Sequence, residues 1–551
     1  MTTLELNKKS LEKSIGRRLS DKEIKEDISM FGTPVGRIEG NKIIVDITPN
    51  RPDLLGEQGF ARAFSSYLGI KKGLRKYSVS ESKKKVIVEG VVSEVRPQIA
   101  CAIVKGLKFN DETIKEVIKI QEKLHITYGR NRKRCAIGIY PLEKISFPVK
   151  YTAKKPNEIK FRPLEHTRAM SGSEILDNHP AGREYRHLLQ NKSIYPILID
   201  SSNKILSMPP IINSHDVGKI ENGTKDVFVE CTGFDINVLK KCLNMVVTSL
   251  AETGGKIYSV NVERNGKKIV TPDLEPEKMR LDINYANKRL GLELKESQIV
   301  LLLERMGFGY SNKTVLIPTY RTDILHQIDL IEDIAIAYGY TNFKEEIPSV
   351  STIGRENDFE RFKNKIANVL VGMGLDEINS TNIVEDKMQV AKMLLDFKPI
   401  MLFNSLSSEY NSMRNLILPS LMNALRHNKN SAYPQNIFEI GQIFKRDKQN
   451  KTETGIIENS RVAVALCHKQ AGFTEIKQKF DRLMKLIGVD YKVEVAAHPS
   501  FIPGRVARVI VNGVGIAYLG EVYPKVLHNF EIDAPVAAFE LNLTELFEEM
   551  N

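Results

Sequence analysis

The chain of 551 residues has only five cysteines, and none of them forms a CxxC pair or a regular spacing. This scarcity argues against a zinc knuckle and a disulfide framework, and it fits a reducing cytoplasm. The sequence also has no run of about 18 apolar residues and no charged-then-apolar signal pattern at its N-terminus. We therefore expect no membrane insertion and no secretion, and a cytoplasmic location.

The sequence lacks internal repeats and low-complexity tracts, and 42% hydrophobic with 27% charged residues describes a globular chain. Its length exceeds what one hydrophobic core supports, so we expect about three to five domains. The 80 Lys and Arg against 68 Asp and Glu give a net charge of +12. That excess favours an acidic partner such as nucleic acid, or it is merely a soluble basic surface, since it is spread along the chain.

Local patterns predict a multidomain α+β chain. Residues 1–78 read as helix, strand, strand and helix, with a capping box at Ser20 and a weakly alternating strand from Lys42 to Ile47. A polar stretch, Ser78 to Lys85, separates them from 87–265, a region of short strands and few strong helices. Helical periods and a strand at Thr314 to Pro318 predict a compact part at 270–345, and alternating helices and strands predict an antiparallel α+β part at 355–551.

An acidic cluster stands out in the third part. Asp329, Glu332 and Asp333 are three and four residues apart on one face of a helix expected from Ile324. Unpaired carboxylates at that spacing repel one another, so they need either solvent or a cation, and oxygen ligands suit magnesium. From these residues alone a solvated face with Asp323 as the helix N-cap is the simpler interpretation.

A second candidate site lies between 205 and 233. The run from Ile205 to Ser214 sets small polar groups beside apolar walls and rigid prolines. The following run from Phe228 to Gly233 alternates like a strand, which places Glu230 and Thr232 on the same face. The bland alternative is that these polar side chains satisfy strand ends.

Motifs spread over nearly the whole chain resemble those of phenylalanyl-tRNA synthetase beta subunits. The most specific is Asn50-Arg51-Pro52-Asp53-Leu54-Leu55, which has a local explanation as a proline turn followed by an Asp53 helix cap. The others are Ala136 to Tyr140, His179-Pro180, Ser207 to Ser214, Tyr320 to Ile324, Glu332-Asp333, Asn436 to Gly441, Pro503-Gly504-Arg505 and Gly520 to Pro524. The length and the missing zinc motif point to the archaeal and eukaryotic type of the family.

The resemblance implies a mixed α/β tRNA-editing domain at 87–265, a winged-helix-like domain at 270–345 and an inactive class II synthetase-like antiparallel sheet domain at 355–551. It implies that the editing domain hydrolyses tyrosine mischarged onto the phenylalanine tRNA. It also implies two sets of site residues: an editing pocket of Leu198, Ser207, Asn213, Glu230 and Thr232, and magnesium-linked carboxylates at Asp323, Asp329, Glu332 and Asp333. The family often has Asp where this chain has Glu230, so the reach of that side chain is longer.

The resemblance further implies an alpha subunit as partner in an (αβ)2 tetramer, phenylalanine tRNA as ligand, and ATP as a substrate of the complex. No aminoacylation residues are expected here, because Ile437 to Ile440 lacks the ATP-binding arginine and Ala538 to Asn542 lacks the final glycine-rich motif. Arg414 and Arg505 are left as structural residues or tRNA contacts. The competing functions are a noncatalytic nucleic-acid-binding scaffold and, further behind, a stand-alone magnesium-dependent enzyme.

Overall fold

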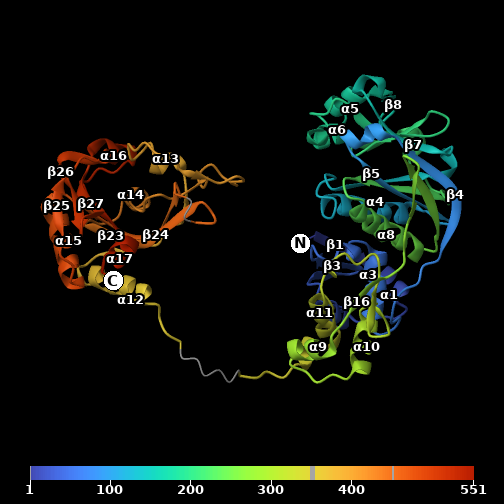
Figure 1. Ribbon diagram of the computed structural model, residues 1–551, viewed down its shortest axis with the longest axis horizontal. Helices are drawn as coiled ribbons and strands as arrows, with labels where there is room; N and C mark the ends of the chain where they lie inside the picture. The colour runs from blue at the N-terminus through green and yellow to red at the C-terminus, as the bar shows by residue number, and fades with distance from the viewer. Residues whose placement is uncertain (1, 348–353, 450–451, 551) are drawn as a thin grey trace. The chain divides into compact units, whose positions relative to one another are not determined.

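The computed structural model describes residues 2–347, 354–449 and 452–550. The chain divides into two compact units, 1–347 and 348–551 (Figure 1). None of the helices in the described ranges combines the length and the apolar character that crossing a membrane requires.

The first unit begins with a three-stranded antiparallel sheet in the order β1-β3-β2. The capping box predicted at Ser20 is present, with Glu23 as its partner, and the strand from Lys42 to Ile47 is confirmed. The expected opening helix is wrong in one respect, because a strand that pairs with β3 precedes it. The elements are β1 (Thr2–Asn7), α1 (Lys8–Ile15), α2 (Asp21–Met30), β2 (Val35–Glu39), β3 (Lys42–Ile47), a 3-10 turn (Pro52–Leu54) and α3 (Glu57–Tyr67).

A large mixed sheet follows, in the order β12-β11-β10-β7-β4-β14-β5-β13-β6, with β15 paired to β14. Its strands are β4 (Val79–Val88), β5 (Gln98–Lys105), β6 (Cys135–Pro141), β7 (Val149–Lys154), β10 (Tyr195–Ile199), β11 (Ile205–Met208), β12 (Ile212–Asn213), β13 (Val227–Gly233), β14 (Lys256–Arg264) and β15 (Lys267–Thr271). The polar stretch Ser78 to Lys85 is therefore not a separator: most of it belongs to β4, which pairs in parallel with β14 and β7.

Two long helices, α4 (Asp111–Ile126) and α8 (Ile236–Glu252), lie in this region, where few strong helices were expected. Their buried residues join one core with Val229 and Cys231 of β13, whereas Phe228 of the same strand packs in a different core. Because side chains alternate along a strand, one face of β13 meets the helices and the other face carries Glu230 and Thr232. The sequence prediction that Glu230 and Thr232 share a face is thus confirmed.

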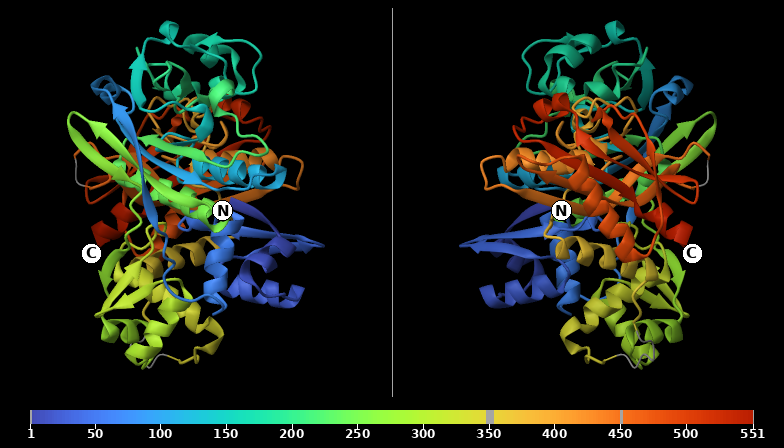
Figure 2. Two further views of the ribbon diagram at one scale, coloured as in Figure 1. Left: turned by 90° about the vertical axis from the view of Figure 1, so that its right-hand side faces the viewer. Right: turned by 90° about the vertical axis from the view of Figure 1, so that its left-hand side faces the viewer.

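A small lobe with its own apolar core extends from the large sheet. It contains β8 (Lys160–Phe161), β9 (Met170–Ser171), α5 (Gly172–Asn178) and α6 (Pro180–Tyr185), and α7 (His215–Gly218) follows β12. Figures 1 and 2 show α5 and α6 at the end of the first unit farthest from residues 277–338.

Residues 277–338 form a three-stranded sheet, β16-β18-β17, with three helices. The elements are β16 (Glu277–Arg280), α9 (Ile283–Leu290), α10 (Glu296–Arg305), β17 (Gly309–Ser311), β18 (Thr314–Ile317) and α11 (Gln327–Tyr338). They share one continuous core with α3 and with α8, and this segment lies beside the N-terminal residues in both views (Figure 2). The helix expected from Ile324 begins at Gln327, and its N-cap is His326 rather than Asp323.

The second unit is built on a seven-stranded sheet, β19-β23-β24-β28-β27-β26-β25, which is antiparallel except where β19 joins β23. Helices cover both faces, since α12, α15 and α17 contribute to one core and α14 to another. The elements are α12 (Asp358–Gly372), β19 (Asp376–Glu377), β20 (Ile383–Val384), α13 (Asp386–Gln389), β21 (Ile400–Met401), β22 (Ser412–Met413), α14 (Leu418–His427), β23 (Gln435–Arg446), β24 (Ile456–Cys467), α15 (Phe473–Ile487), β25 (Lys492–Val495), β26 (Phe501–Val511), β27 (Val514–Val522), α16 (Pro524–Asn529), β28 (Val536–Asn542) and α17 (Leu543–Met550). The predicted mixed α+β character is confirmed.

Candidate functional site

The large sheet curves until strands from its two ends meet at a group of buried polar side chains. The Tyr140 hydroxyl of β6 lies 2.8 Å from Ser207 Oγ of β11, 3.0 Å from Glu230 Oε1 of β13 and 3.4 Å from Asn213 Oδ1 of β12. Ser207, Asn213 and Glu230 line one cavity together with the Pro209–Ile212 turn. The structure thus brings together three of the five predicted pocket residues.

Leu198 and Thr232, the other two predicted pocket residues, lie beside this cavity and do not line it. Leu198 is fully buried and pairs with Ser207 across β10 and β11. The Thr232 hydroxyl accepts a hydrogen bond of 3.1 Å from Arg96 Nε. These two residues can therefore affect a pocket only indirectly, through their contacts with Ser207 and Arg96.

Glu230 has the most unusual environment in the cavity. Its side chain is buried, Oε1 contacts the Tyr140 hydroxyl, and Oε2 has no hydrogen-bond partner among the described residues. Burial raises the pKa of Glu230 to about 8, although the Tyr140 hydrogen bond and the Arg96 charge oppose that rise. At neutral pH the carboxyl is mostly protonated, so it can donate and accept a hydrogen bond.

Gly138 makes the room that this arrangement needs. It is the partner of Glu230 in the pairing of β6 with β13. A Cβ at position 138 would lie 2.5 Å from Glu230 Oε1 and would also collide with the Tyr140 hydroxyl. Any larger residue would displace the polar group, so this glycine is required by space and not by backbone conformation.

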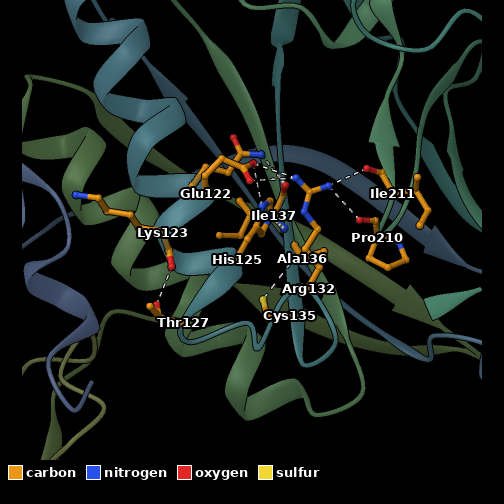
Figure 3. A network of polar contacts seen from close by, with 11 residues as sticks. Glu122, Lys123, His125, Thr127, Arg132, Cys135, Ala136, Ile137, Pro210 and Ile211 are labelled. Carbon is orange, nitrogen blue, oxygen red and sulfur yellow. Dashed lines mark hydrogen bonds and ion pairs between the residues drawn. The ribbon is translucent and has the colours of Figure 1, made fainter. Parts of the chain in front are cut away.

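A second network holds one wall of the cavity (Figure 3). Arg132 Nη1 donates to the carbonyl oxygens of Pro210, at 3.3 Å, and Ile211, at 2.7 Å. Arg132 Nη2 pairs with both carboxylate oxygens of Glu122, at 3.0 and 3.2 Å. Although burial acts to raise it, the pKa of Glu122 falls to about 2 because His125 and Arg132 stabilise the carboxylate.

His125 belongs to the same network and is fixed as a neutral imidazole. Its Nε2 accepts the Ile137 backbone N–H at 2.8 Å, so Nδ1 carries the proton and faces Glu122 at 3.1 Å. Burial lowers the pKa of His125. Since both ring nitrogens are used, this histidine supports the wall and is not free to act as a base.

The acidic cluster at 323–333 is organised by an arginine that sequence reasoning did not consider. Arg321 makes a bidentate pair with Asp323, at 2.9 and 2.7 Å, and its Nη2 also lies 2.7 Å from Asp333 Oδ2. Burial acts to raise the pKa of Asp323, but the Arg321 charge overrides it and holds that pKa below its usual value. Arg51 and Asp53 form a second bidentate pair, at 2.9 Å for each bond.

The remaining acids have separate environments. Asp329 Oδ2 accepts the backbone N–H groups of Leu325 and His326 at 2.8 and 2.7 Å, and Glu332 is exposed. In the described ranges no three of these carboxylates bring ligand oxygens within 4.8 Å of one another. As arranged, the four acids do not fit a magnesium ion held by three or more of them, because Arg321 and backbone groups occupy their oxygens.

In the second unit the unexplained Arg414 has a structural role. It is buried, pairs with Glu439 at 2.5 Å and donates to Gln442 O at 2.7 Å. Arg505 is more exposed and pairs with Glu521 at 2.6 Å. All of these contacts are internal, so Arg414 is not available to bind a phosphate.

Comparisons with known proteins agree with this architecture. A family model described as "Phenylalanyl tRNA synthetase beta chain CLM domain" matches residues 344–543, and one described as "tRNA synthetase B5 domain" matches residues 279–340. The chain is 38% identical over 577 residues to the phenylalanine–tRNA ligase beta subunit of Thermococcus kodakarensis, with 100% of each chain covered. This chain belongs to the family of phenylalanine–tRNA ligase beta subunits.

Other members of the beta-subunit family give the same result. The beta subunit of Pyrococcus horikoshii is 39% identical, and the alignment covers 99% of this chain and 100% of the relative. A crystal structure of an N-terminal fragment of the Pyrococcus horikoshii phenylalanyl-tRNA synthetase beta subunit matches with a TM-score of 0.59 and 39% identity. That match covers 61% of this chain and 99% of the fragment.

Sequence reasoning missed several residues that shape the site of this beta subunit. Tyr140 and Gly138 were recognised only as parts of a motif, and Arg96, Arg132 and Arg321 were not singled out. Strand alternation could have placed Gly138 and Tyr140 on one face of β6. No local signal marks Arg96 or Arg132, which act on residues far away or on backbone oxygens, whereas the Arg321-Thr322-Asp323 spacing could have suggested the Arg321–Asp323 pair.

Proposed function

We propose that this beta subunit of a phenylalanine–tRNA ligase hydrolyses tyrosine that has been mischarged onto the phenylalanine tRNA. The ligase as a whole attaches phenylalanine to that tRNA with ATP, and an alpha subunit supplies the aminoacylation centre. The unpaired, buried Glu230 Oε2 beside Tyr140 and Ser207 is the observation that supports the proposal best.

The proposed discrimination rests on one hydroxyl group. Tyrosine differs from phenylalanine only by its phenolic O–H, which a hydrophobic synthetic pocket rejects poorly. A protonated Glu230 can exchange hydrogen bonds with that group, and Asn213 is a polar neighbour in the same cavity. Phenylalanine would leave Glu230 Oε2 without a partner, so the cavity would favour tyrosine.

The chain would act in the hydrolysis mainly by positioning its substrate. Water adds to the ester carbonyl carbon, the bond between that carbon and the ribose oxygen of the tRNA then breaks, and a proton from the water ends on that ribose oxygen. His125 has no free ring nitrogen to take the proton of the water. Ser207, Asn213 and the wall held by Arg132 are the groups that would orient the ester and the water.

The test is tyrosine release from mischarged tRNA by the assembled complex. Glu230→Ala and Thr232→Val should slow this release at least about tenfold while phenylalanine charging changes little. Glu94→Gln, at an exposed position of the same region, serves as the matched control. Unchanged tyrosyl-tRNA hydrolysis in both pocket variants would remove β13 from the site and favour a noncatalytic, nucleic-acid-binding scaffold.

We also propose an (αβ)2 tetramer in the cytoplasm, binding of phenylalanine tRNA, and a winged-helix-like arrangement for residues 270–345. The net charge of +12 and the order of helices and strands from β16 to α11 support the last two assignments. Co-purification from native cells should recover one alpha-like partner in equal amount. Recovery of the beta chain alone would contradict the assembly.

For magnesium, we propose fewer protein ligands than the sequence predicted. Asp323 and Asp333 are neutralised by Arg321, which leaves Asp329 and Glu332 as the predicted ligands that have no arginine partner among the described residues. Magnesium bound to them would keep most of its water shell. The other role of magnesium in this ligase is with ATP at the alpha subunit, and no step of the proposed hydrolysis depends on the acidic cluster.

A further inference from the structure

Three cysteines that are far apart in the sequence meet behind the proposed pocket. Cys135 of β6, Cys231 of β13 and Cys242 of α8 have sulfur atoms that all lie within 4.8 Å of one another. Among the described residues they are the one group of three or more potential metal ligands at this spacing. Each is at most 1% exposed. We call these residues the thiol cluster.

Strand register and helix position explain how the thiol cluster forms. Cys135 pairs with Gly233, so Cys231 lies two residues along β13 on the same face. That face meets α8, whose Cys242 completes the group. Glu230 and Thr232 point to the opposite face of β13. The cluster is therefore separate from the cavity but shares two strands with it.

An arginine acts on the thiol cluster through its charge. Arg96 is buried and donates hydrogen bonds to Thr232 and to the Arg132 carbonyl oxygen, and no carboxylate lies at ion-pair distance from it in the described ranges.

Arg134 and His125 are the other basic groups that act on the thiol cluster, and His125 is neutral here. Three thiolates and one divalent cation would carry a single negative charge, opposite in sign to the charges of the buried Arg96 and of the partly exposed Arg134. Buried charges need such a partner.

We propose that Cys135, Cys231 and Cys242 bind one soft divalent cation, of the zinc and cadmium class, through three thiolates. Sulfur lies about 2.3 Å from zinc, which puts the sulfurs of a three-thiolate site roughly 4 Å apart, within the observed spread. Binding releases the thiol protons to solvent and involves no redox step. The ion would join β6, β13 and α8 directly behind Glu230.

The alternative is that the three thiols pack as small apolar side chains, as buried cysteines commonly do. In the first case the protein binds a metal ion and is stabilised by it, and in the second case it does neither. Because the thiol cluster is closed to solvent, the ion should enter before the core forms. Metal must therefore be present while the chain folds, during expression, and not only added afterwards.

Cadmium is the probe, and the full chain is expressed in medium with and without cadmium chloride, then exhaustively dialysed. We expect one tightly held cadmium ion per chain, an ultraviolet sulfur-to-cadmium absorption band and a higher unfolding temperature. Cys242→Ala and Cys231→Ala should lose the ion and the band. Cys101→Ala and Cys467→Ala, at buried cysteines outside the thiol cluster, should keep both.

Absence of the band in the parent chain, or a band that survives Cys242→Ala and Cys231→Ala, would overturn the proposal. If circular dichroism shows that one of these variants is unfolded, the other variant and the parent chain still decide. The outcome is independent of editing, since tyrosyl-tRNA hydrolysis is assayed separately.

Discussion

Replacing Glu230 with glutamine removes one titrating group from the proposed pocket while keeping the side-chain length. Burial raises the pKa of Glu230 from 4.5 to about 8. Between these two values the folded chain holds a proton that the unfolded chain has released. The stability due to protonated Glu230 is therefore complete below pH 4.5 and is lost as the pH rises through about 8.

The expected change in the free energy of unfolding follows from the difference between the pKa values of Glu230 in the unfolded and the folded chain. One pKa unit corresponds to about 1.4 kcal/mol, so the parent should lose about 1.4 kcal/mol per pH unit relative to Glu230→Gln. Between pH 5.5 and 7.5 the difference in unfolding free energy between the two should change by about 2–3 kcal/mol. For a unit of this size that is a relative shift of roughly 5 °C in the unfolding temperature.

The assay is thermal unfolding of the full chain at several pH values between 5.5 and 7.5, followed in the transition of the first unit. Glu94→Gln serves as the control, because it removes an exposed carboxyl from the same region. Its unfolding temperature should follow that of the parent at every pH. If the unfolding temperature of Glu230→Gln also changes with pH as that of the parent does, the Glu230 carboxyl is ionised at neutral pH. The proposal that a protonated Glu230 selects tyrosine by a hydrogen bond is then refuted.

Three further predictions concern other parts of the chain. Arg132→Ala frees the Pro210 and Ile211 carbonyl groups, so tyrosyl-tRNA hydrolysis by the complex should fall roughly 10- to 100-fold with little change in phenylalanine charging; equal losses of both activities would contradict a local role. Arg321→Met leaves two buried carboxylates unpaired and should lower the free energy of unfolding, measured with denaturant, by about 3–5 kcal/mol. Asp329→Asn with Glu332→Gln should lower it by under about 1 kcal/mol and alter only the magnesium response. Pyrophosphate exchange with phenylalanine and ATP should be absent for the purified chain and appear when the alpha subunit is added; exchange without it would refute the division of roles.

The features that could be predicted from the sequence are those that depend on residues close together along the chain. The Ser20 capping box, the strand at Lys42 to Ile47 and the alternation around Glu230 depend on spacings of two to four residues. The polar strand β4 could not be predicted in the same way, because its stability comes from parallel pairing with β14, far along the chain. Its composition alone resembles a linker.

In the acidic cluster, too, the sequence pattern did not predict the residue that neutralises the charges. Asp323 was an acceptable N-cap by position, but Arg321 pairs with it and with Asp333, and this buried pair is stronger than a capping bond. Helical spacing predicted that Asp329, Glu332 and Asp333 converge, whereas the three carboxyl groups have separate environments, and it said nothing about Arg321, which pairs with Asp333. A helix wheel cannot reveal a partner that lies before the helix begins.

The proposed pocket depends on β13 having different chemistry on its two faces. Glu230 and Thr232 face the cavity side, and Cys231 between them faces α8 and the thiol cluster. Arg96 links the two sides, because it donates to Thr232 and its charge also acts on Cys135 and Glu230. Three thiolates that hold a divalent cation would carry a net negative charge and would compensate that arginine, whereas a cluster of neutral thiols would leave its charge to act on the Glu230 carboxyl. The protonation of Glu230, and through it the preference for tyrosine, would then depend on a metal ion on the opposite face of the strand.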